Sequence, residues 1–240
     1  MKVLLIQCRT DASAAHELDC VLRHGKLTPD EITIANPVLK PGSLRIHPAQ
    51  DFDAILMGGS GQFGIVQAAD TLAFQRGLTE IRPVLDAVVE GDLPFLGMCL
   101  GHQVLAWHIG AAVVADPKQE EVGSFKVTLT EAGKNDPLFT GMPEQFIAQH
   151  GHKESVDELP AGAVQLSIGK RNPMSSFRVG AAVYGVQFHP ELTLDDLMAR
   201  LSLYPDYLHG KTVAEARKGF KESPDAPRVL RNFFEHVVAA

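Results

Sequence analysis

A cysteine stands between two contrasting stretches in the segment PFLGMCLGHQ. Leu93 to Met98 has the pattern of a buried strand and Leu100 to Ile109 that of a helix, which leaves Cys99 at the turn between them. One glycine lies two positions before it and another two positions after it, so the pattern is G-x-C-x-G. A strand-to-helix elbow strains its central residue and needs small neighbours where side chains would collide. The pattern therefore indicates a presented thiol nucleophile.

Two further features favour catalysis for Cys99. The thiol would lie at the carboxyl end of a central strand, where open α/β sheets bind ligands, and at a helix N-terminus, whose dipole favours a thiolate. The amide of Leu100 would point toward an oxyanion formed beside the sulfur. A buried, unreactive cysteine is the alternative, since free cysteine is among the most buried residue types. Cys8 and Cys20 lack such a setting, and we interpret both as structural or incidental.

A thiol nucleophile needs a base and a group that orients the base. Among ten histidines, His189 is well placed, because it ends the apolar run AAVYGVQF and precedes Pro190 and Glu191. Residues two apart on an extended segment project to the same side, and proline stiffens that geometry, so the Glu191 carboxylate can hold the imidazole. Cys99, His189 and Glu191 thus form a candidate triad of nucleophile, base and orienting group. A satisfied structural histidine is the alternative for His189.

The glycine-rich stretch LMGGSGQFG, residues 56–64, is a candidate for the second amide of an oxyanion hole. It follows a predicted strand, and its glycines allow backbone N–H groups to approach a substrate carbonyl closely. A phosphate-binding loop is the competing interpretation. The stretch lacks the Lys-Ser/Thr ending of a nucleotide P-loop, so we prefer the oxyanion hole.

The composition restricts the class of protein. The chain has 240 residues, 45% hydrophobic and 21% charged, which predicts one soluble globular domain. A net charge of −7 and the lack of a dense basic run argue against nucleic acid or an acidic membrane surface as a partner. No run approaches the length of a membrane span, and three cysteines fit a reducing compartment, so we expect a cytoplasmic protein.

Apolar runs predict an α/β fold whose parallel sheet continues into antiparallel strands. In the first half, strand-like runs alternate with helical spacing, and this order requires parallel neighbours joined by helices on both faces. After Leu105, close-set strands separated by Gly, Pro or Asn indicate antiparallel pairs packed onto the sheet or extending it. From Leu194 onward we expect three helical segments, the last beginning near Pro227. The predicted strands are 3–7, 32–35, 54–57, 94–98, 125–130, 145–149, 164–168, 176–179 and 182–188, with a helix over 72–89.

Four blocks of the sequence resemble class I, triad-type glutamine amidotransferase domains. They are GGSG at 58–61, GMCLGHQ at 97–103, QHGHKESVDELPAG at 149–162 and YGVQFHPE at 184–191. The third block is similar to a segment of the amidotransferase domain of GMP synthase. The blocks follow the family's order, and residues 1–57 fit its leading strands. The resemblance implies a three-layer, flavodoxin-like α/β fold with a mainly parallel central sheet, helices on both faces and added antiparallel strands.

The resemblance also implies a reaction. Cys99 would attack the side-chain amide of L-glutamine, forming a γ-glutamyl thioester and releasing ammonia. His189 would move the proton, and Glu191 would orient His189. The amides of Gly59 and Leu100 would form the oxyanion hole.

Substrate contacts are implied at two further places. Gln103, just inside the helix after the elbow, would help to hold the substrate. The backbone at Gln149, His150 and Gly151 would meet the α-amino and carboxylate groups of the glutamyl moiety. His150 and His152 also suggest a metal pair, but two histidines without a nearby third ligand make a weak site. We therefore expect neither a metal nor a cofactor.

The sequence departs from the family pattern in three places. Gly58-Gly59-Ser60 stands where Gly-Gly-Pro is usual, which changes the expected rigidity of the oxyanion loop. His152 stands where aspartate is common in the GMP synthase type. The tail from about 193 to 240 is longer than a minimal amidotransferase domain. We expect it to be a helical extension that covers the edge of the site or forms an interface.

Residues 1–240 are expected to form one amidotransferase domain without a P-loop or a second domain that activates an acceptor with ATP. The partner of such a glutaminase would be a separate synthase subunit. A γ-glutamyl hydrolase or peptidase is one alternative, since its thioester intermediate differs only in the leaving group. A thiol-bearing stress or binding protein similar to the DJ-1 superfamily is another, and the FHPE block counts against it.

Overall fold

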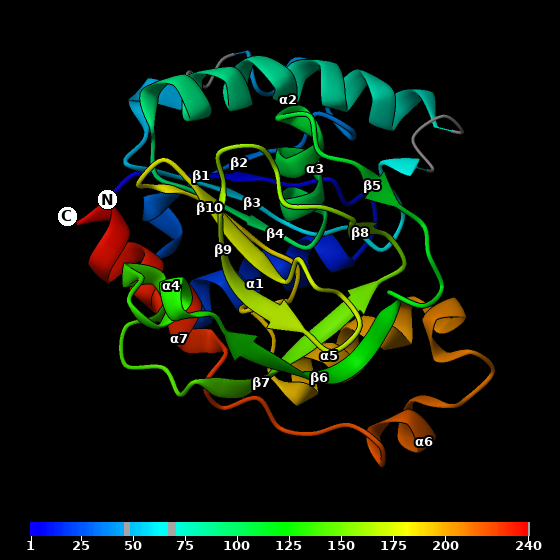
Figure 1. Cartoon of the computed structure of the whole chain (residues 1–240). Helices are drawn as coiled ribbons and strands as arrows, with labels where there is room; N and C mark the ends of the chain where they lie inside the picture. The colour runs from blue at the N-terminus through cyan, green and yellow to red at the C-terminus, as the bar shows by residue number, and fades with distance from the viewer. Residues whose placement is uncertain (46–48, 67–70, 240) are drawn as a thin grey trace.

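The computed structural model describes residues 1–45, 49–66 and 71–239, and within them a nine-stranded sheet carries helices on both faces (Figure 1). The strand order is β2-β1-β3-β4-β11-β10-β9-β6-β7. Neighbours from β2 to β11 are parallel, and the pairs from β11 to β7 are antiparallel. The strands of this sheet are β1 (Val3–Ile6), β2 (Ile32–Ala35), β3 (Ala54–Met57), β4 (Phe95–Met98), β6 (Glu121–Leu129), β7 (Gln145–His152), β9 (Val164–Gly169), β10 (Ser176–Val179) and β11 (Val183–Val186).

The described part of the chain also contains seven α-helices, a small second sheet and several short 3₁₀ or π-helical turns. Strands β5 (Val113–Val114) and β8 (Ser155–Val156) form the second sheet. A 3₁₀ turn, η5 (Pro205–Leu208), follows α5, and a π-helical turn, η6 (Phe233–Val238), continues α7. The helices are α1 (Ser13–Gly25), α2 (Leu72–Gly91), α3 (Leu100–His108), α4 (Glu131–Lys134), α5 (Leu194–Leu203), α6 (Val213–Arg217) and α7 (Pro227–Asn232).

The parallel strands are buried on both faces, because each face is covered by helices. Leu4 and Ile6 of β1 point into one core, which α2 and α3 complete, whereas Val3 and Leu5 point into the other, which α1 and α7 complete. This arrangement explains why these strands read as continuous apolar runs. In Figure 1, α2 and α3 lie above the sheet, and α1 and α7 lie below it.

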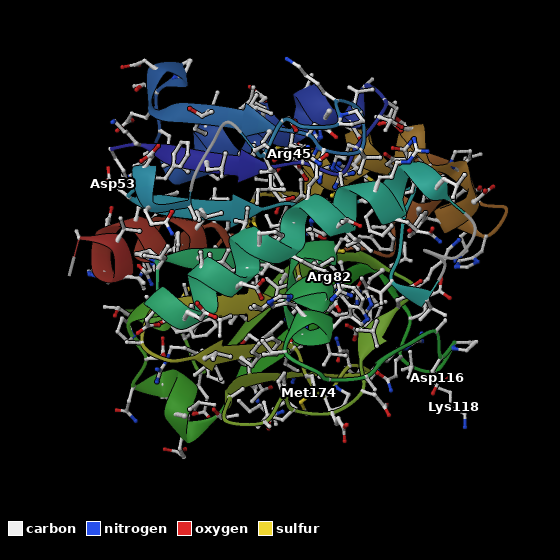
Figure 2. The ribbon with its side chains drawn as sticks, turned by 90° about the horizontal axis from the view of Figure 1, so that it is seen from above. Arg45, Asp53, Arg82, Asp116, Lys118 and Met174 are labelled. Carbon is white, nitrogen blue, oxygen red and sulfur yellow. The ribbon has the colours of Figure 1, made fainter. Side chains whose placement is uncertain are left out.

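Helix α2 crosses the upper layer at full length when the molecule is seen from above (Figure 2). The guanidinium of Arg82, on α2, lies 4.3 Å from the ring centre of Trp107 on α3, so a cation–π contact ties the two helices of this face together. Helix α2 spans 20 residues. Neither it nor any other helix in residues 1–45, 49–66 and 71–239 combines the length and apolar character required to cross a bilayer.

The predicted order of parallel strands followed by antiparallel strands is confirmed, with two longer strands than expected. β6 begins at Glu121 rather than at residue 125, and β7 continues to His152 rather than ending at residue 149. Charged, histidine and glycine positions interrupt both apolar runs in the sequence. In the structure these positions pair in register, with Glu121 opposite His152 and Gly123 opposite His150.

The five parallel strands of the described sheet end together at one edge. Ile6 pairs with Met57, and Met98 pairs with Val186, so the segments that follow β1, β3, β4 and β11 emerge side by side. This edge is where parallel α/β sheets place their ligands. The residues of the predicted triad and oxyanion hole follow β3, β4 and β11.

Candidate active site

Cys99 occupies the elbow between β4 and α3. Its backbone has φ 53° and ψ −103°, a region that non-glycine residues rarely adopt. A side chain at Gly97 would meet the backbone of Gly101, and a side chain at Gly101 would meet the carbonyl of Met57. The two glycines therefore let the helix turn back against the strands, and the predicted strained elbow is confirmed.

The elbow is fixed to the end of the sheet by backbone hydrogen bonds. The Cys99 N–H donates to the carbonyl of Val186 on β11 at 2.9 Å, and the Cys99 carbonyl accepts from the N–H of Gln103 at 3.1 Å. Leu100 opens α3, so its N–H is one of those that have no acceptor within the helix. The first free N–H of α3 therefore belongs to the residue that directly follows Cys99.

His189 and Glu191 lie on the segment that follows β11, next to Cys99. The His189 N–H donates to the carbonyl of Gln149 at 2.9 Å, which ties this segment to β7. The Nδ1 of His189 lies 2.8 Å from Oε1 of Glu191, and since a carboxylate only accepts, the ring donates. The ring also hydrogen-bonds to Cys99. The structure thus brings together the three side chains of the predicted triad.

The charges around His189 favour its protonated form. Burial lowers the pKa of His189, but the negative charge of Glu191 and the interaction with Cys99 outweigh burial and raise that pKa to about 9. Burial raises the pKa of Glu191, whereas His189 and Arg200 lower it, and their combined effect holds it well below its usual range. The pair therefore exists as an imidazolium and a carboxylate at neutral pH.

The glycine loop packs directly against this pair. A Cβ on Gly59 would lie 2.8 Å from Cε1 of His189 and 3.3 Å from Cβ of Cys99, so only glycine fits there. The N–H of Gly59 donates to Oε1 of the buried Glu17 at 3.1 Å. In this structure the loop is thus in place, while its amide is held by a carboxylate behind it.

Glu17 is itself part of a buried ion pair with Arg9. The Arg9 Nε donates to Glu17 Oε1 at 2.8 Å, and both side chains are almost fully buried. Gln7 donates to the other Glu17 oxygen at 3.1 Å. The Arg9 guanidinium also lies close to Gly59 and lines a pocket together with His189. The ion pair of Arg9 and Glu17 therefore lies between the glycine loop and α1 and supports the loop.

The predicted substrate residues differ in what their side chains do. Gly151 lines the pocket that contains Cys99 and also the adjoining pocket that contains His189. Gln103 lines the first pocket, where its amide donates to the carbonyl of Glu154 at 2.6 Å and to Gln187 at 3.1 Å.

Gln149 and His150 turn their side chains elsewhere. The Gln149 amide donates to the carbonyl of Lys221 at 2.9 Å and to Ser223 at 3.0 Å, which are both on the C-terminal segment. The His150 ring is fully buried and faces Glu121. Of this three-residue segment, the structure places only Gly151 on the two pockets.

The C-terminal extension covers one side of the site. Tyr207, on η5, lines both pockets, and Lys153 lies over its ring, with Nζ 4.6 Å from the ring centre. The remaining lining residues from this extension are all on α5 or at its end: Leu197, Arg200, Leu201 and Tyr204. The extension thus lies over the edge of the site.

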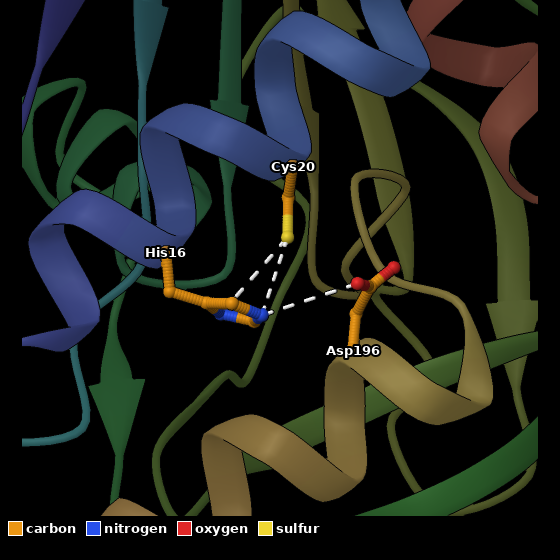
Figure 3. Close-up of side chains that lie close together, drawn as sticks. All are labelled: His16, Cys20 and Asp196. Carbon is orange, nitrogen blue, oxygen red and sulfur yellow. Dashed lines mark hydrogen bonds and ion pairs between the residues drawn. The ribbon is translucent and has the colours of Figure 1, made fainter.

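Arg200 connects the triad to a second cluster of polar side chains, His16, Cys20 and Asp196. Its Nη1 donates to Glu191 Oε1 at 3.0 Å, while its Nε and Nη2 lie 3.3 and 3.2 Å from Nδ1 of His16. The Nε2 of His16 lies 3.6 Å from the sulfur of Cys20 and 3.9 Å from Oδ1 of Asp196 (Figure 3). A continuous network thus runs behind Glu191.

The cluster of His16, Cys20 and Asp196 has ligand types that bind metals, but its partners do not suit an ion. Arg200 only donates, so Nδ1 of His16 accepts, and the neutral ring carries its proton on Nε2, the atom that faces the other two residues. Arg23 donates to Asp196 at 2.7 Å and to Cys20 at 3.4 Å. Burial raises the pKa of Cys20 to about 12. Two guanidinium groups therefore fill the place of a cation.

Three residues of this site, Arg9, Glu17 and Arg200, were missed in the sequence. Arg9 follows β1 at the same edge as the elbow, and a charged residue at the carboxyl end of a parallel strand is a usable signal. Glu17 and Arg200 lie on the buried faces of α1 and α5. A charge on the apolar face of a helix indicates a buried partner.

Comparisons with known proteins identify the family. A family model described as "Glutamine amidotransferase class-I" matches residues 26–201. The chain therefore belongs to the class I glutamine amidotransferase family. The GMP synthase [glutamine-hydrolyzing] of Thermosipho africanus is 36% identical over 111 residues, which are 46% of this chain and 21% of that protein. A GMP synthase [glutamine-hydrolyzing] subunit of Thermococcus kodakarensis is 33% identical over 110 residues, 45% of this chain and 56% of that relative.

Solved structures agree on the fold over the whole chain. A glutamine amidotransferase from Thermotoga maritima superposes with a TM-score of 0.74 at 20% identity, covering 100% of this chain and 99% of that one. The glutamine amidotransferase of Methylobacillus flagellatus gives 0.69 at 17% identity, covering 98% and 95%. In sequence, by contrast, the matched segments are about a fifth of the first curated relatives and just over half of the separate subunits.

Proposed function

We propose that this protein hydrolyses the γ-amide of L-glutamine through a cysteinyl thioester. The observation that carries this proposal is the strained elbow at Cys99 beside the hydrogen-bonded pair of His189 and Glu191. The strain presents the sulfur at the end of the sheet, and the pair supplies a proton carrier whose orientation is fixed.

The reaction has two halves that balance around His189. In the first, His189 already carries the proton, the sulfur of Cys99 bonds to the γ-carbon, and the imidazolium gives its proton to the departing nitrogen, which leaves as ammonia. In the second, the now neutral His189 takes a proton from water, the hydroxide attacks the thioester, and the sulfur leaves while the proton stays on His189. Glutamate and the free enzyme result. Glu191 stays ionised throughout and keeps Nδ1 protonated and aligned.

The tetrahedral oxyanion would be stabilised by two backbone amides. Leu100 offers its N–H from the first position of α3, where the helix dipole adds to the effect. Gly59 would offer the second N–H after its peptide turns away from Glu17. We propose that the loop at Gly59 switches between Glu17 and the substrate oxygen as the second amide of the hole.

The glutamyl group would lie in the pocket between Cys99 and Gly151. Lys153 and Glu154 line this pocket, and their opposite charges match the α-carboxylate and α-ammonium of an amino acid. We place the backbone contact at Gly151. Gln103, Gln149 and His150 shape the segment around it.

We further propose that residues 1–240 act as one amidotransferase domain that passes its ammonia to a separate synthase subunit. The support is that a relative named as one subunit of GMP synthase is matched over 56% of its own length. The acceptor that such a partner aminates would determine the biological product. The compartment in which both act is predicted to be the cytoplasm.

A γ-glutamyl hydrolase is the second candidate, and one observation favours it. The pocket beside His189, the group that protonates the leaving nitrogen, is lined by Leu192, Leu197, Leu201 and Tyr204. An apolar amine attached to the γ-carboxyl would lie on this side. The alternative of a non-catalytic thiol protein gives the aligned pair of His189 and Glu191 no role.

The deciding experiment compares ammonia and glutamate release from L-glutamine with the cleavage of a γ-glutamyl dipeptide. Cys99→Ala protein is the control for both substrates. Turnover of glutamine with little turnover of the dipeptide supports the first candidate. Faster turnover of the dipeptide selects the second candidate. Equal rates for the wild type and Cys99→Ala would overturn the nucleophile in both.

A further inference from the structure

Three buried side chains converge on one face of the antiparallel pair of strands β6 and β7. His150 and His152 are two residues apart on β7, so they project from the same face of that strand. Glu121, on β6, is paired directly opposite His152. All three side chains are almost completely buried. The third ligand that the two histidines lack in the local sequence is thus supplied by the neighbouring strand.

The spacing of the three groups matches the shell of a small divalent ion. Oε2 of Glu121 lies 3.1 Å from Nδ1 of His150 and 3.5 Å from Nε2 of His152. The three ligand atoms all lie within 4.8 Å of one another. Bonds of Zn²⁺ to nitrogen and oxygen place tetrahedral ligand atoms about 3.3–3.6 Å apart. The groups need only small movements to bind a common ion.

The hydrogen bonds of His152 leave one nitrogen directed at the carboxylate. Nδ1 lies 3.0 Å from the carbonyl oxygen of Glu154, which only accepts, so Nδ1 carries a proton. In the neutral ring Nε2 is then an acceptor, and it faces an acceptor oxygen of Glu121. Two buried acceptors need a cation between them, either a proton on Nε2 or a metal ion.

The arrangement around the cluster is the one that orients metal ligands. A histidine ligand generally donates its other ring N–H to a carbonyl or carboxylate, as His152 does to Glu154. The second oxygen of Glu121 accepts the N–H of Arg171 at 3.1 Å, which fixes the carboxylate. Neither ring nitrogen of His150, nor Nε2 of His152, has a hydrogen-bond partner of good geometry among the described residues. The potential ligands are therefore held in place with their lone pairs uncommitted.

We propose that Glu121, His150 and His152 bind a divalent transition-metal ion of the zinc type. Two imidazoles and one carboxylate form a ligand set that suits Zn²⁺. Gly151 lies between the two histidines and lines both pockets of the candidate active site. The ion would cross-link β6 to β7 and stiffen the backbone at Gly151, so its role is to position that segment.

The test uses the full chain carrying Cys99→Ala, so that the elbow thiol cannot bind the metal. Chelator-treated protein is titrated with Zn²⁺, and with Co²⁺ as a spectroscopic probe. We expect one ion per chain, visible Co²⁺ absorption without a sulfur charge-transfer band, and a higher unfolding temperature with Zn²⁺. Adding His152→Asn, which keeps a donor for the Glu154 carbonyl, or Glu121→Gln should weaken binding about 100-fold or more.

A matched control removes the sulfur of the other cluster. Cys20→Ala, in the same Cys99→Ala background, should bind Zn²⁺ as the parent does. The proposal is overturned if the parent binds no ion, or if His152→Asn and Glu121→Gln bind as tightly as the parent. It is equally overturned if Cys20→Ala abolishes binding. Because the readout is metal binding in an inactive background, failure here is distinguishable from failure of the proposed reaction.

Discussion

Arg200 donates to the same oxygen of Glu191 that accepts the ring N–H of His189. The distances are 3.0 Å from Nη1 of Arg200 and 2.8 Å from Nδ1 of His189. The carboxylate is fully buried and is therefore held from two sides. One donor belongs to the segment after β11, and the other belongs to α5 of the C-terminal extension. The extension thus takes part in aligning the predicted base.

Removing Arg200 should slow the reaction and shift its acid limb. Arg200→Met leaves Glu191 free to rotate, and a misaligned imidazole costs about 100-fold in kcat/KM. Arg200 also lowers the pKa of Glu191, so that pKa rises in the variant. The acid limb of the kcat/KM profile should then move to higher pH, because the carboxylate is lost earlier as pH falls.

Two variants serve as controls, one at Arg200 itself and one at an arginine elsewhere on the extension. Arg200→Lys keeps the positive charge. The acid limb of its kcat/KM profile should therefore lie closer to that of the wild type than its maximal kcat/KM does. Arg217→Met removes an exposed arginine that pairs with Asp195 on the same extension, and it should leave the profile unchanged. An unshifted acid limb in Arg200→Met would remove the role assigned to Arg200.

The alkaline limb should report His189. Its pKa is raised to about 9, so kcat/KM should fall above that pH as the ring loses the proton that the leaving nitrogen needs. Glu191 contributes to this raised pKa, so Glu191→Gln should move the limb to lower pH. The protonated ring also stabilises the fold, fully below about 6.5, and this contribution is lost as pH rises through about 9. A limb that stays in place in Glu191→Gln would contradict the assignment.

The backbone strain at Cys99 should be measurable as a difference in the free energy of unfolding between two variants of this residue. Cys99→Ala and Cys99→Gly should both lose γ-glutamyl transfer by roughly 1,000-fold or more. Glycine adopts positive φ without a Cβ penalty, so Cys99→Gly should be more stable than Cys99→Ala by about 1 kcal/mol. Urea unfolding of the two variants checks this difference. If alanine proves the more stable, the elbow is not strained in solution.

Adding a side chain at Gly59 should reduce activity, because the space beside this glycine is filled by His189. A Cβ there would lie 2.8 Å from the ring of His189, so Gly59→Ala should displace the imidazole and lower kcat/KM about 100-fold. Gly219 has only an ordinary contact at 3.6 Å, so Gly219→Ala should retain full activity. Comparable rates for Gly59→Ala and the wild type would mean that the loop leaves His189 during turnover.

Local pattern predicted the sheet well because its parallel strands are buried on both faces and bounded by turns. Helix α1 was not predicted as a separate element, and its composition explains this. Its buried positions include Ser13, Glu17 and Cys20, so the buried face is not an apolar stripe. A start signal is present, because the Asp11 side chain accepts the N–H of Ser13 at 2.9 Å, but no apolar stripe follows it.

At the candidate site, too, local sequence pattern predicted some of the residues and missed others. Cys99, His189 and Glu191 could be proposed from sequence because local geometry fixes each of them, at an elbow or on an extended segment. Arg200 and Glu121 could not, because each reaches its partner from an element distant in sequence. The bond between Gly59 and Glu17 depends on the orientation of one peptide, which no residue pattern specifies.

The order of the chain has a consequence for synthesis. Cys99 precedes Arg200 by about 100 residues, so at roughly 5–20 residues per second the thiol emerges roughly 5–20 s before the side chain that helps to align its proton carrier. Lys221 and Ser223, which accept hydrogen bonds from the side-chain amide of Gln149, are synthesised later still. A chain still being translated therefore carries the proposed nucleophile without the aligned form of its proposed base. The proposed release of ammonia would therefore begin only after the extension has folded over the site.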